Sequence, residues 1–369
     1  MMKSLEIMLK REPVLMVSSF LALISMVLVP PSLSYIHYID FKVLGCLFCL
    51  MLVVSGFQKI FLFNHIASFL LTFAHNPRQV SQVLIVLTFF SSMAITNDVA
   101  LITFVPLTIV VFSLCRKTEP ILPTIILQTV GANVGSSLTP VGNPQNLYLF
   151  SYYSIPAKTF FFTMLPLVFA GAMLLLLLSL SIPRTSKGFT VEIEKPAKMD
   201  VRQTIRYALL FLLSLGAVFN VLSWYSAVII VVLFSEKILL KKVDYSLLLT
   251  FVALFIFVGN LGSLRYVQDF FRNLLEGRVF ATSLIASQLI SNVPATFLLS
   301  PFTGNSRQLL LGVNAGGCGT LIASMASVIS FKYFINFAPN ETKRYFYTFT
   351  GVNLLFVLLF TVIWILFLQ

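Results

Sequence analysis

Long apolar runs alternate with short polar connections along the whole chain. Seven runs are uninterrupted, and we interpret them as membrane-spanning helices, which need about 20 apolar residues to cross a bilayer. They cover residues 14–30, 41–63, 159–182, 207–220, 223–234, 245–261 and 346–368. The pattern predicts an all-α integral membrane protein.

Four further apolar segments are interrupted near their middle by small or polar residues. In chain order they are 80–112 at Thr96-Asn97-Asp98, 121–150 between Gly135 and Pro144, 280–301 at Ser291-Asn292, and 309–333 between Gly316 and Thr320. The first and third read as re-entrant hairpins, and the second and fourth as broken helices. Two weaker stretches, 64–78 and 265–278, read as helices in the membrane interface.

The interruptions repeat in order and in spacing. Asn97 precedes Pro106 by nine residues, and Asn292 precedes Pro301 by nine. In the broken helices, an Asn precedes a Thr by six residues in both halves, at Asn133 and Thr139 and at Asn314 and Thr320. We therefore divide the chain into two repeats, 1–182 and 207–369, joined by a basic linker at 183–206.

Counting the segments predicts an inverted repeat. The first half has four crossings, and the helix at 207–220 makes a fifth. Because five is an odd number, the second repeat has the opposite orientation in the membrane, and the whole chain crosses about nine times. Cytoplasmic connections are enriched in Lys and Arg. When the N-terminus is inside and the C-terminus outside, the cytoplasmic connections hold Lys3, Lys10, Arg11, Arg116, Lys117, the linker, Lys237, Lys241, Lys242, Lys343 and Arg344. The outer stretch 265–278 is the exception, and there Asp269 and Glu276 offset the arginines. We expect a protein of the cytoplasmic membrane.

Composition narrows the function classes. Hydrophobic residues make up 58% of the chain and charged residues 10%, against about a quarter charged in soluble domains. The net charge of +12 lies in short connections, so it reports topology and we expect no nucleic-acid partner. Cys46 and Cys49 lie inside an apolar run and read as packing residues. A phosphate-binding loop of the ATP-driven kind is absent from the sequence.

The interruptions carry the candidate chemistry. Non-helical backbone at membrane depth is tolerated where it lines a cavity, and each break exposes a helix N-terminus that favours anions. Asp98 is the only carboxylate that we place near the membrane midplane, where it is a candidate for proton or cation coupling. The alternative is that these residues only cap and pack broken helices. The candidate substrate and ion-binding residues are Thr96, Asn97, Asp98, Asn133, Gly135, Ser136, Ser137, Thr139, Asn143, Ser291, Asn292, Asn314, Gly316 and Thr320.

These motifs resemble the ion transporter superfamily, which includes divalent anion:sodium symporters, arsenite pumps, NhaD-type antiporters and citrate-transporter-like domains. Thr96-Asn97-Asp98 and Ser291-Asn292-Val293 stand where the anion symporters carry Ser-Asn-Thr. The resemblance implies sodium sites at Thr96, Asn97 and Gly135 and at Ser291, Asn292 and Gly316. It also implies a homodimer in which a transport domain moves against a scaffold. The Asn-Asp tip is closer to the arsenite pumps.

We therefore expect a secondary transporter that moves a small anion with Na⁺ or H⁺ and needs no cofactor. A Na⁺/H⁺ antiporter or an anion efflux protein of the same fold is the alternative. A membrane-embedded enzyme would need a catalytic pair such as Ser/His, which the interrupted segments do not offer. A channel would not need the repeat.

Overall fold

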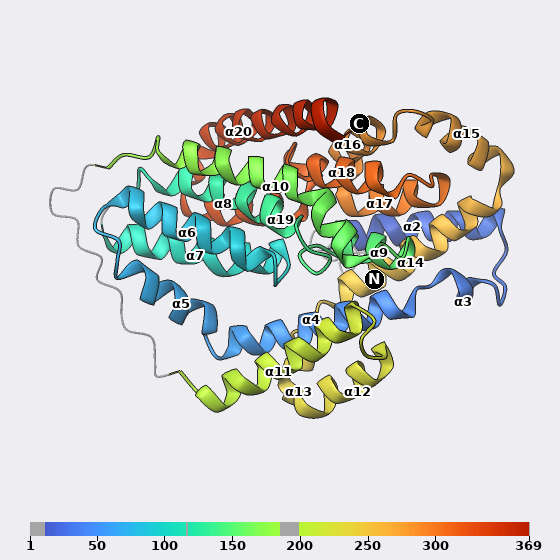
Figure 1. Ribbon diagram of the computed structural model, residues 1–369, viewed down its shortest axis with the longest axis horizontal. Helices are drawn as coiled ribbons and strands as arrows, with labels where there is room; N and C mark the ends of the chain where they lie inside the picture. The colour runs from blue at the N-terminus through green and yellow to red at the C-terminus, as the bar shows by residue number, and fades with distance from the viewer. Residues whose placement is uncertain (1–11, 116, 185–198, 369) are drawn as a thin grey trace.

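The computed structural model describes residues 12–115, 117–184 and 199–368, and every regular element within these residues is helical. The prediction of an all-α membrane protein is confirmed. Most helices run roughly along the long axis of the molecule (Figure 1). The expected basic positions Lys3, Lys10, Arg11 and Arg116, and most of the linker, lie outside the described residues.

The first half contains one helical hairpin and one broken helix. Its elements are α2 (Pro13–Leu28), α3 (Tyr35–Tyr38), α4 (Phe41–Lys59), α5 (Leu62–Leu71), α6 (Pro77–Ser92), α7 (Asn97–Leu114), α8 (Ile121–Ser136), α9 (Pro144–Tyr152) and α10 (Ala157–Ser179). The hairpin is α6 and α7. It begins at Asn76, whose Oδ1 accepts from Gln79 N at 3.0 Å ahead of Pro77. The broken helix is α8 and α9.

The second half has the same two features. Its elements are α11 (Val201–Val218), α12 (Trp224–Phe234), α13 (Lys237–Leu240), α14 (Tyr245–Ser263), α15 (Arg265–Leu275), α16 (Val279–Ile290), α17 (Asn292–Leu299), α18 (Ser306–Gly317), α19 (Met325–Phe337) and α20 (Thr342–Ile363). The hairpin is α16 and α17, and the broken helix is α18 and α19. The two hairpins lie toward opposite ends of the long axis, with their tips toward the middle (Figure 1).

Some boundaries differ from the prediction because polar caps start helices early. The helix expected from residue 207 begins at Val201, since Asp200 Oδ1 accepts from Gln203 N at 3.1 Å. The linker expected at 183–206 is shorter by that amount. The interfacial stretch expected at 64–78 is helical only over Leu62–Leu71, and Asn76 then caps a new helix.

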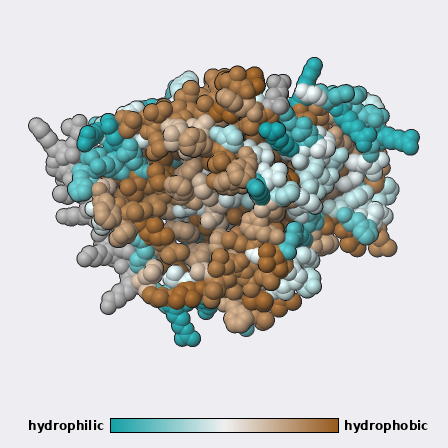
Figure 2. Space-filling model, viewed as in Figure 1, coloured by the Kyte–Doolittle hydropathy of each residue, from teal (hydrophilic) through white to brown (hydrophobic). Residues whose placement is uncertain are grey.

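Six described helices are long and apolar enough to cross a membrane: Phe41–Lys59, Asn97–Leu114, Ala157–Ser179, Val201–Val218, Tyr245–Ser263 and Pro339–Leu368. Apolar residues cover the middle of the face in Figure 2, and hydrophilic residues gather at both ends of the long axis. The helices α2 and α12 are apolar but shorter. The count of nine crossings therefore stays a prediction.

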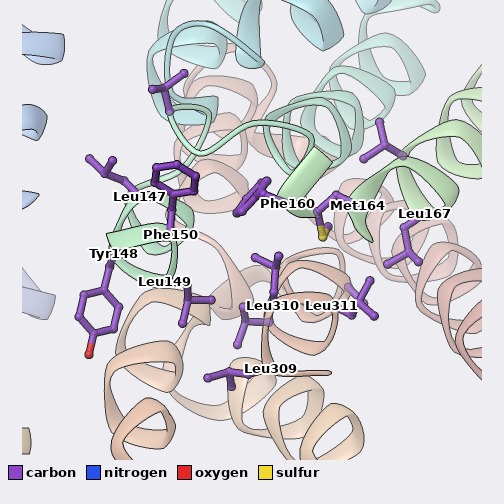
Figure 3. Close-up of a cluster of buried hydrophobic side chains, with 14 of the residues drawn as sticks. Leu147, Tyr148, Leu149, Phe150, Phe160, Met164, Leu167, Leu309, Leu310 and Leu311 are labelled. Carbon is purple, nitrogen blue, oxygen red and sulfur yellow. The ribbon is translucent and has the colours of Figure 1, made fainter. Parts of the chain in front are cut away.

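The largest core cluster joins the two halves. Side chains of α9, α10 and α18 face one another in it, with Phe150 and Phe160 rings 6.0 Å apart (Figure 3). Tyr148 of α9 stacks on Phe297 of α17, with ring centroids 4.0 Å apart. Because lipid tails are as apolar as these side chains, close packing rather than water exclusion holds such contacts together. The core fixes the broken helix of the first half against the hairpin of the second.

Candidate functional site

The tip of the first hairpin is bound to the broken helix beside it. Asn97 N donates to Gly142 O at 3.1 Å. Asn97 Nδ2 donates to Asn133 Oδ1 at 2.9 Å, and both side chains are buried. Buried amides at membrane depth need such partners. The contact places the tip of α7 at the break between α8 and α9.

The asparagines of the two broken helices reach across to the opposite half. Asn133 Oδ1 also accepts from Ser324 Oγ at 3.0 Å, and Asn133 Nδ2 donates to Gly317 O at 3.1 Å. Asn314 Nδ2 donates to Asn146 Oδ1 at 2.7 Å. The matched Asn positions of the sequence repeat thus join the halves at the centre of the molecule.

The matched threonines fasten each break to its own hairpin. Thr139 Oγ1 donates to the carbonyl of Met93, four residues before the tip Asn97. Thr320 Oγ1 donates to the carbonyl of Gln288 at 3.1 Å, four residues before the tip Asn292. The same bond recurs in both halves, so these threonines position the tips.

The matched glycines allow the helices of each half to approach closely. A Cβ on Gly135 would lie 2.1 Å from Phe89 O, and a Cβ on Gly316 would lie 2.6 Å from Ser287 Cβ and 3.0 Å from Leu284 O. Such small-residue contacts are typical of membrane helix pairs. Both glycines lie at helix–helix contacts rather than on the cavity described below.

The serines and caps expected at the breaks take other partners. Asn143 Nδ2 donates to Ser136 Oγ at 2.7 Å, and Ser137 Oγ donates to Asn133 O at 2.7 Å. Ser137 and Asn314 also line a separate cavity of about 10 Å³. Thr96, Asn143, Ser291 and Ser324 stand at N-cap positions, but none makes a side-chain cap bond. Asn143 and Ser324 instead bind side chains of other elements, and Ser291 and Ser324 line the cavity described below.

A cavity of about 80 Å³ lies where the two hairpin tips meet. Apart from Thr250, every residue on its wall is a capping or first-turn residue of a helix. The wall comprises Glu12, Val14, Leu15, Asn97, Asp98, Pro144, Gln145, Asp244, Ser246, Leu247, Thr250, Ser291, Asn292, Val293, Pro294, Ser324 and Met325. Of the predicted site residues, only Asn97, Asp98, Ser291 and Asn292 line it.

Six helix N-termini therefore converge on this cavity. Each carries a partial positive charge of about half an elementary charge. Three of them bear a carboxylate: Glu12 precedes α2, Asp98 lies in the first turn of α7, and Asp244 caps α14. The other three, α9, α17 and α19, have no acidic residue in their caps or first turns. The part of the wall formed by α2, α7 and α14 is thus acidic. In the part formed by α9, α17 and α19, no carboxylate offsets the partial positive charges of the helix N-termini.

Two buried polar atoms on the cavity wall have no hydrogen-bond partner among the described residues. They are Asp98 Oδ1 and Gln145 Nε2, and Gln145 is 1% exposed. Buried polar groups normally find partners, and an unmade bond costs about 1–3 kcal/mol. The cavity wall thus holds one unpartnered acceptor and one unpartnered donor.

Asp98 is not the only carboxylate on this cavity. Glu12 and Asp244 line the same cavity, although each precedes its helix in the sequence and reads there as a surface residue. Burial raises the pKa of Glu12, and the like charge of Asp244 adds to the effect, while Lys332 opposes it. Among the described residues, no three His, Cys, Asp or Glu side chains gather into a metal-binding set.

Sequence reasoning missed Gln145, Glu12 and Asp244. Gln145 follows an Asn-Pro helix start, and a polar residue in the first turn of a half-helix is a signal that could have found it. Glu12 and Asp244 offered no such signal, because only the fold brings their helix starts to the hairpin tips. The predicted sodium sites lie partly on the cavity, through Asn97, Ser291 and Asn292, and they stay predictions.

Sequence comparison finds relatives that are named as transporters or membrane proteins. A transporter of Methanocaldococcus jannaschii is 33% identical over 299 residues, covering 80% of this chain and 82% of that protein. The inner membrane protein YbiR of Escherichia coli is 32% identical over 303 residues, covering 80% of both chains. A silicon efflux transporter of Oryza sativa is 32% identical over 134 residues, 36% of this chain and 27% of its own length. The model of the citrate transporter family matches residues 7–309, and the chain belongs to that family of membrane transporters.

Proposed function

We propose that this protein is a secondary active transporter that moves a small anion, a carboxylate or an inorganic oxyanion, together with Na⁺ or H⁺. One observation carries the proposal: first turns from both halves of the chain meet on one cavity that holds an unpartnered donor and an unpartnered acceptor. Interrupted helices that meet near the midplane are the usual construction of secondary transporter sites.

The anion belongs at the part of the wall formed by α9, α17 and α19. The N-termini of these three helices carry no neighbouring carboxylate, so their free N–H groups and dipole ends favour negative charge. Gln145 Nε2 adds a buried donor that has no hydrogen-bond partner among the described residues. A cavity of about 80 Å³ suits a small ion rather than a long-chain substrate.

The coupling cation belongs at Asp98. An ionised carboxylate without a partner is costly in a low-dielectric interior, and a bound cation or proton removes that cost. Among the described residues, no Lys or Arg lines the cavity to serve as a permanent counter-ion. Cation and anion therefore stabilise each other's binding, which is the thermodynamic basis of coupled transport.

The repeated contacts support alternating access. The Thr139 and Thr320 bonds and the close approaches at Gly135 and Gly316 occupy matching positions in the two halves. Inverted repeats rock against each other around a central site. We place the protein in the cytoplasmic membrane, as the name of YbiR suggests for that relative, with its N-terminus inside, and we propose that it is a homodimer.

A cation antiporter or an anion efflux protein is the second candidate. Three carboxylates on one cavity wall favour cation exchange, and one relative is named a silicon efflux transporter. The two candidates differ at Gln145. An anion carrier needs this donor, whereas an exchanger of sodium and protons needs only the carboxylates.

The test is the melting temperature of the purified protein against citrate, succinate, sulfate, phosphate and silicate, with sodium or choline and at two pH values. A ligand of the native state raises the melting temperature by mass action. We expect one anion to raise it in the presence of the coupling cation, and Gln145→Leu to lose that shift. Gln128→Leu, which replaces a buried glutamine outside the cavity wall, should keep it.

Two outcomes would decide against an anion carrier. A response to sodium or pH alone that Asp98→Asn abolishes and Gln145→Leu preserves would support the antiporter. If the melting temperature responds to no cation or anion while the protein still melts cooperatively, this cavity is not the transport site.

A further inference from the structure

We propose that a cavity beside the start of α4 binds the phosphate group of an anionic phospholipid. The cavity, which we call the rim cavity, has a volume of about 210 Å³. Its wall is built from the start of α4, the turn between α9 and α10, and the residues that follow α11. The inference goes beyond the proposed transport function, because the rim cavity and the cavity at the hairpin tips share no described residue.

Lys42 gives the rim cavity its charge. Among the described residues it is the only charged one on the wall; it is part-buried and forms no ion pair with any of them. Asp40 does not line the cavity, and both of its oxygens are occupied: Oδ1 accepts from Val43 N at 3.0 Å, and Oδ2 accepts from Ser151 Oγ at 3.0 Å. The wall therefore offers an ammonium group without a counter-ion, which suits a phosphate.

Neutral donors stand on the same wall. Helix α10 begins there at Ala157, and its N-cap residue Pro156 has no side-chain group to bond to the free N–H groups of the first turn. Those groups point toward the start of the helix and favour a negative charge there. Ser154 and Asn220 add an exposed hydroxyl and an exposed amide. Lysine, helix start and polar side chains together match the several oxygens of a phosphate group.

The two helices that end at the rim cavity have part of their terminal carbonyl groups bonded. Ser154 after α9 and Asn220 after α11 have φ angles of 50° and 60°, the left-handed conformation that ends a helix sharply. The N–H group after each of them donates to the carbonyl five residues earlier, at 3.1 Å after α9 and at 2.8 Å after α11. These bonds reduce the repulsion that helix C-termini would exert on an anion.

Apolar side chains beside the rim cavity favour a lipid over a free ion. Phe219 forms part of the wall and is 38% exposed, and the neighbouring Val221 and Leu222 are 77% and 43% exposed. Phe162 of α10 is 57% exposed. Such side chains are stable against acyl chains, whereas the lysine and the helix start need a polar group. A phospholipid satisfies both needs at once, and inorganic phosphate satisfies only the second.

The predicted topology places the rim cavity in the outer leaflet. With the N-terminus inside, α4 and α10 begin at the outer ends of their crossings and α11 ends there. Three separate parts of the chain thus reach the cavity from the same side of the membrane. The ligand is therefore a phospholipid of the outer leaflet.

The test is the melting temperature of the full-length protein in an uncharged detergent while phosphatidylglycerol is added. A diacylglycerol with the same acyl chains tests the chains alone, and inorganic phosphate tests the anion alone. A lipid that binds the native state raises the melting temperature by mass action. We expect phosphatidylglycerol to raise it, and the diacylglycerol and inorganic phosphate to leave it unchanged at the concentrations at which the lipid saturates.

Two variants act on the rim cavity, and a third is the matched control. Lys42→Met removes the charge and keeps the apolar stem. It should need about fivefold more phosphatidylglycerol for half of the stabilisation, which is the effect of one lysine at an anionic membrane surface. Ala157→Leu narrows the cavity at the helix start and should lose most of the response. Lys158→Met should match the wild type, because Lys158 is exposed beside the cavity and does not line it.

Four outcomes would overturn the rim cavity as a phospholipid site. They are no response to phosphatidylglycerol, an equal response to the diacylglycerol, an equal loss in Lys42→Met and Lys158→Met, and a response to inorganic phosphate that Lys42→Met removes. The last would assign the cavity to a free anion. A phosphate response that Gln145→Leu removes and Lys42→Met keeps belongs to the transport cavity, so it supports the proposed function and leaves phosphate unbound at the rim cavity, as we expect.

Discussion

At the scale of single residues, Asn133 makes the hydrogen bonds that connect the first hairpin tip to both broken helices. Its side chain accepts from Asn97 and Ser324 and donates to Gly317 O, so it joins elements from both halves. We expect Asn133→Leu to lower the free energy of unfolding by about 2–3 kcal/mol, because three buried groups lose a partner. We also expect it to abolish transport. Thermal unfolding and uptake into proteoliposomes measure the two effects.

Gln128 on the same helix provides the comparison. It accepts from Thr108 Oγ1 at 2.8 Å and donates to Thr88 Oγ1 at 3.0 Å, but both hydroxyls also bond to their own helices. Gln128→Leu should therefore cost about 1 kcal/mol or less, with transport kept, because few groups are left unpaired. Equal loss of transport in both variants would mean that Asn133 acts only through stability.

At the scale of elements, the contact between α6 and α8 depends on one glycine. A Cβ on Gly135 would lie 2.1 Å from the backbone oxygen of Phe89, which cannot rotate away. Gly135→Ala should force the helices apart and cost about 1–3 kcal/mol. The change is read as a fall in melting temperature in detergent.

Gly131, one turn earlier on α8, is the internal control. The nearest atom to a Cβ there is Ile85 O at 3.7 Å, an ordinary contact. Gly131→Ala should be neutral or stabilise by up to about 1 kcal/mol through helix propensity. If both substitutions destabilise equally, the close approach at Gly135 is not the cause.

The turn between α12 and α13 is tied to two other helices by ion pairs. Glu236 accepts from Lys59 of α4 and from Arg206 of α11, the second at 3.1 Å. The Lys59 hydrogen bond, and with it Arg206, lowers the pKa of Glu236 below 4.5. A carboxylate with a lowered pKa stabilises the fold above pH 4.5, and this contribution is lost as the pH falls through the lowered value.

Glu236→Gln should therefore lower the melting temperature at pH 7. The loss in the free energy of unfolding should be less than about 1 kcal/mol, because the ion pairs are part-exposed. The gap to the wild type should close as the pH falls below 4.5. A pH series of melting curves checks this, and a gap that widens in acid would contradict the assigned role of the ion pairs.

Local chemistry explains which elements could be predicted from the sequence. Prolines, glycines and asparagines interrupt apolar runs, so the breaks near Asn97, Asn143 and Asn292 could be recognised. The early start of α11 depends on Asp200, which looks like a linker residue. Which residues line the cavity depends on six helix starts that are distant in sequence. Only the fold shows that Glu12 and Asp244 belong to it, because neither stands in a repeated motif, whereas the Asn-Pro helix start before Gln145 was a usable signal.

At the scale of the whole molecule, the two hairpins open toward opposite ends, which predicts opposite sides of the membrane for their connections (Figure 1). Glu119 follows the first hairpin and Gly304 follows the second, and both are exposed. A Cβ at Gly304 meets no atom within 4 Å, so a cysteine fits there.

In a background with the four native cysteines replaced, Gly304→Cys should react with an impermeant maleimide in intact cells. Glu119→Cys should react only after the membrane is opened, because the positive-inside rule places its connection in the cytoplasm. Labelling of both positions from the same side would contradict the inverted repeat, and with it the alternating access on which the proposed coupling depends.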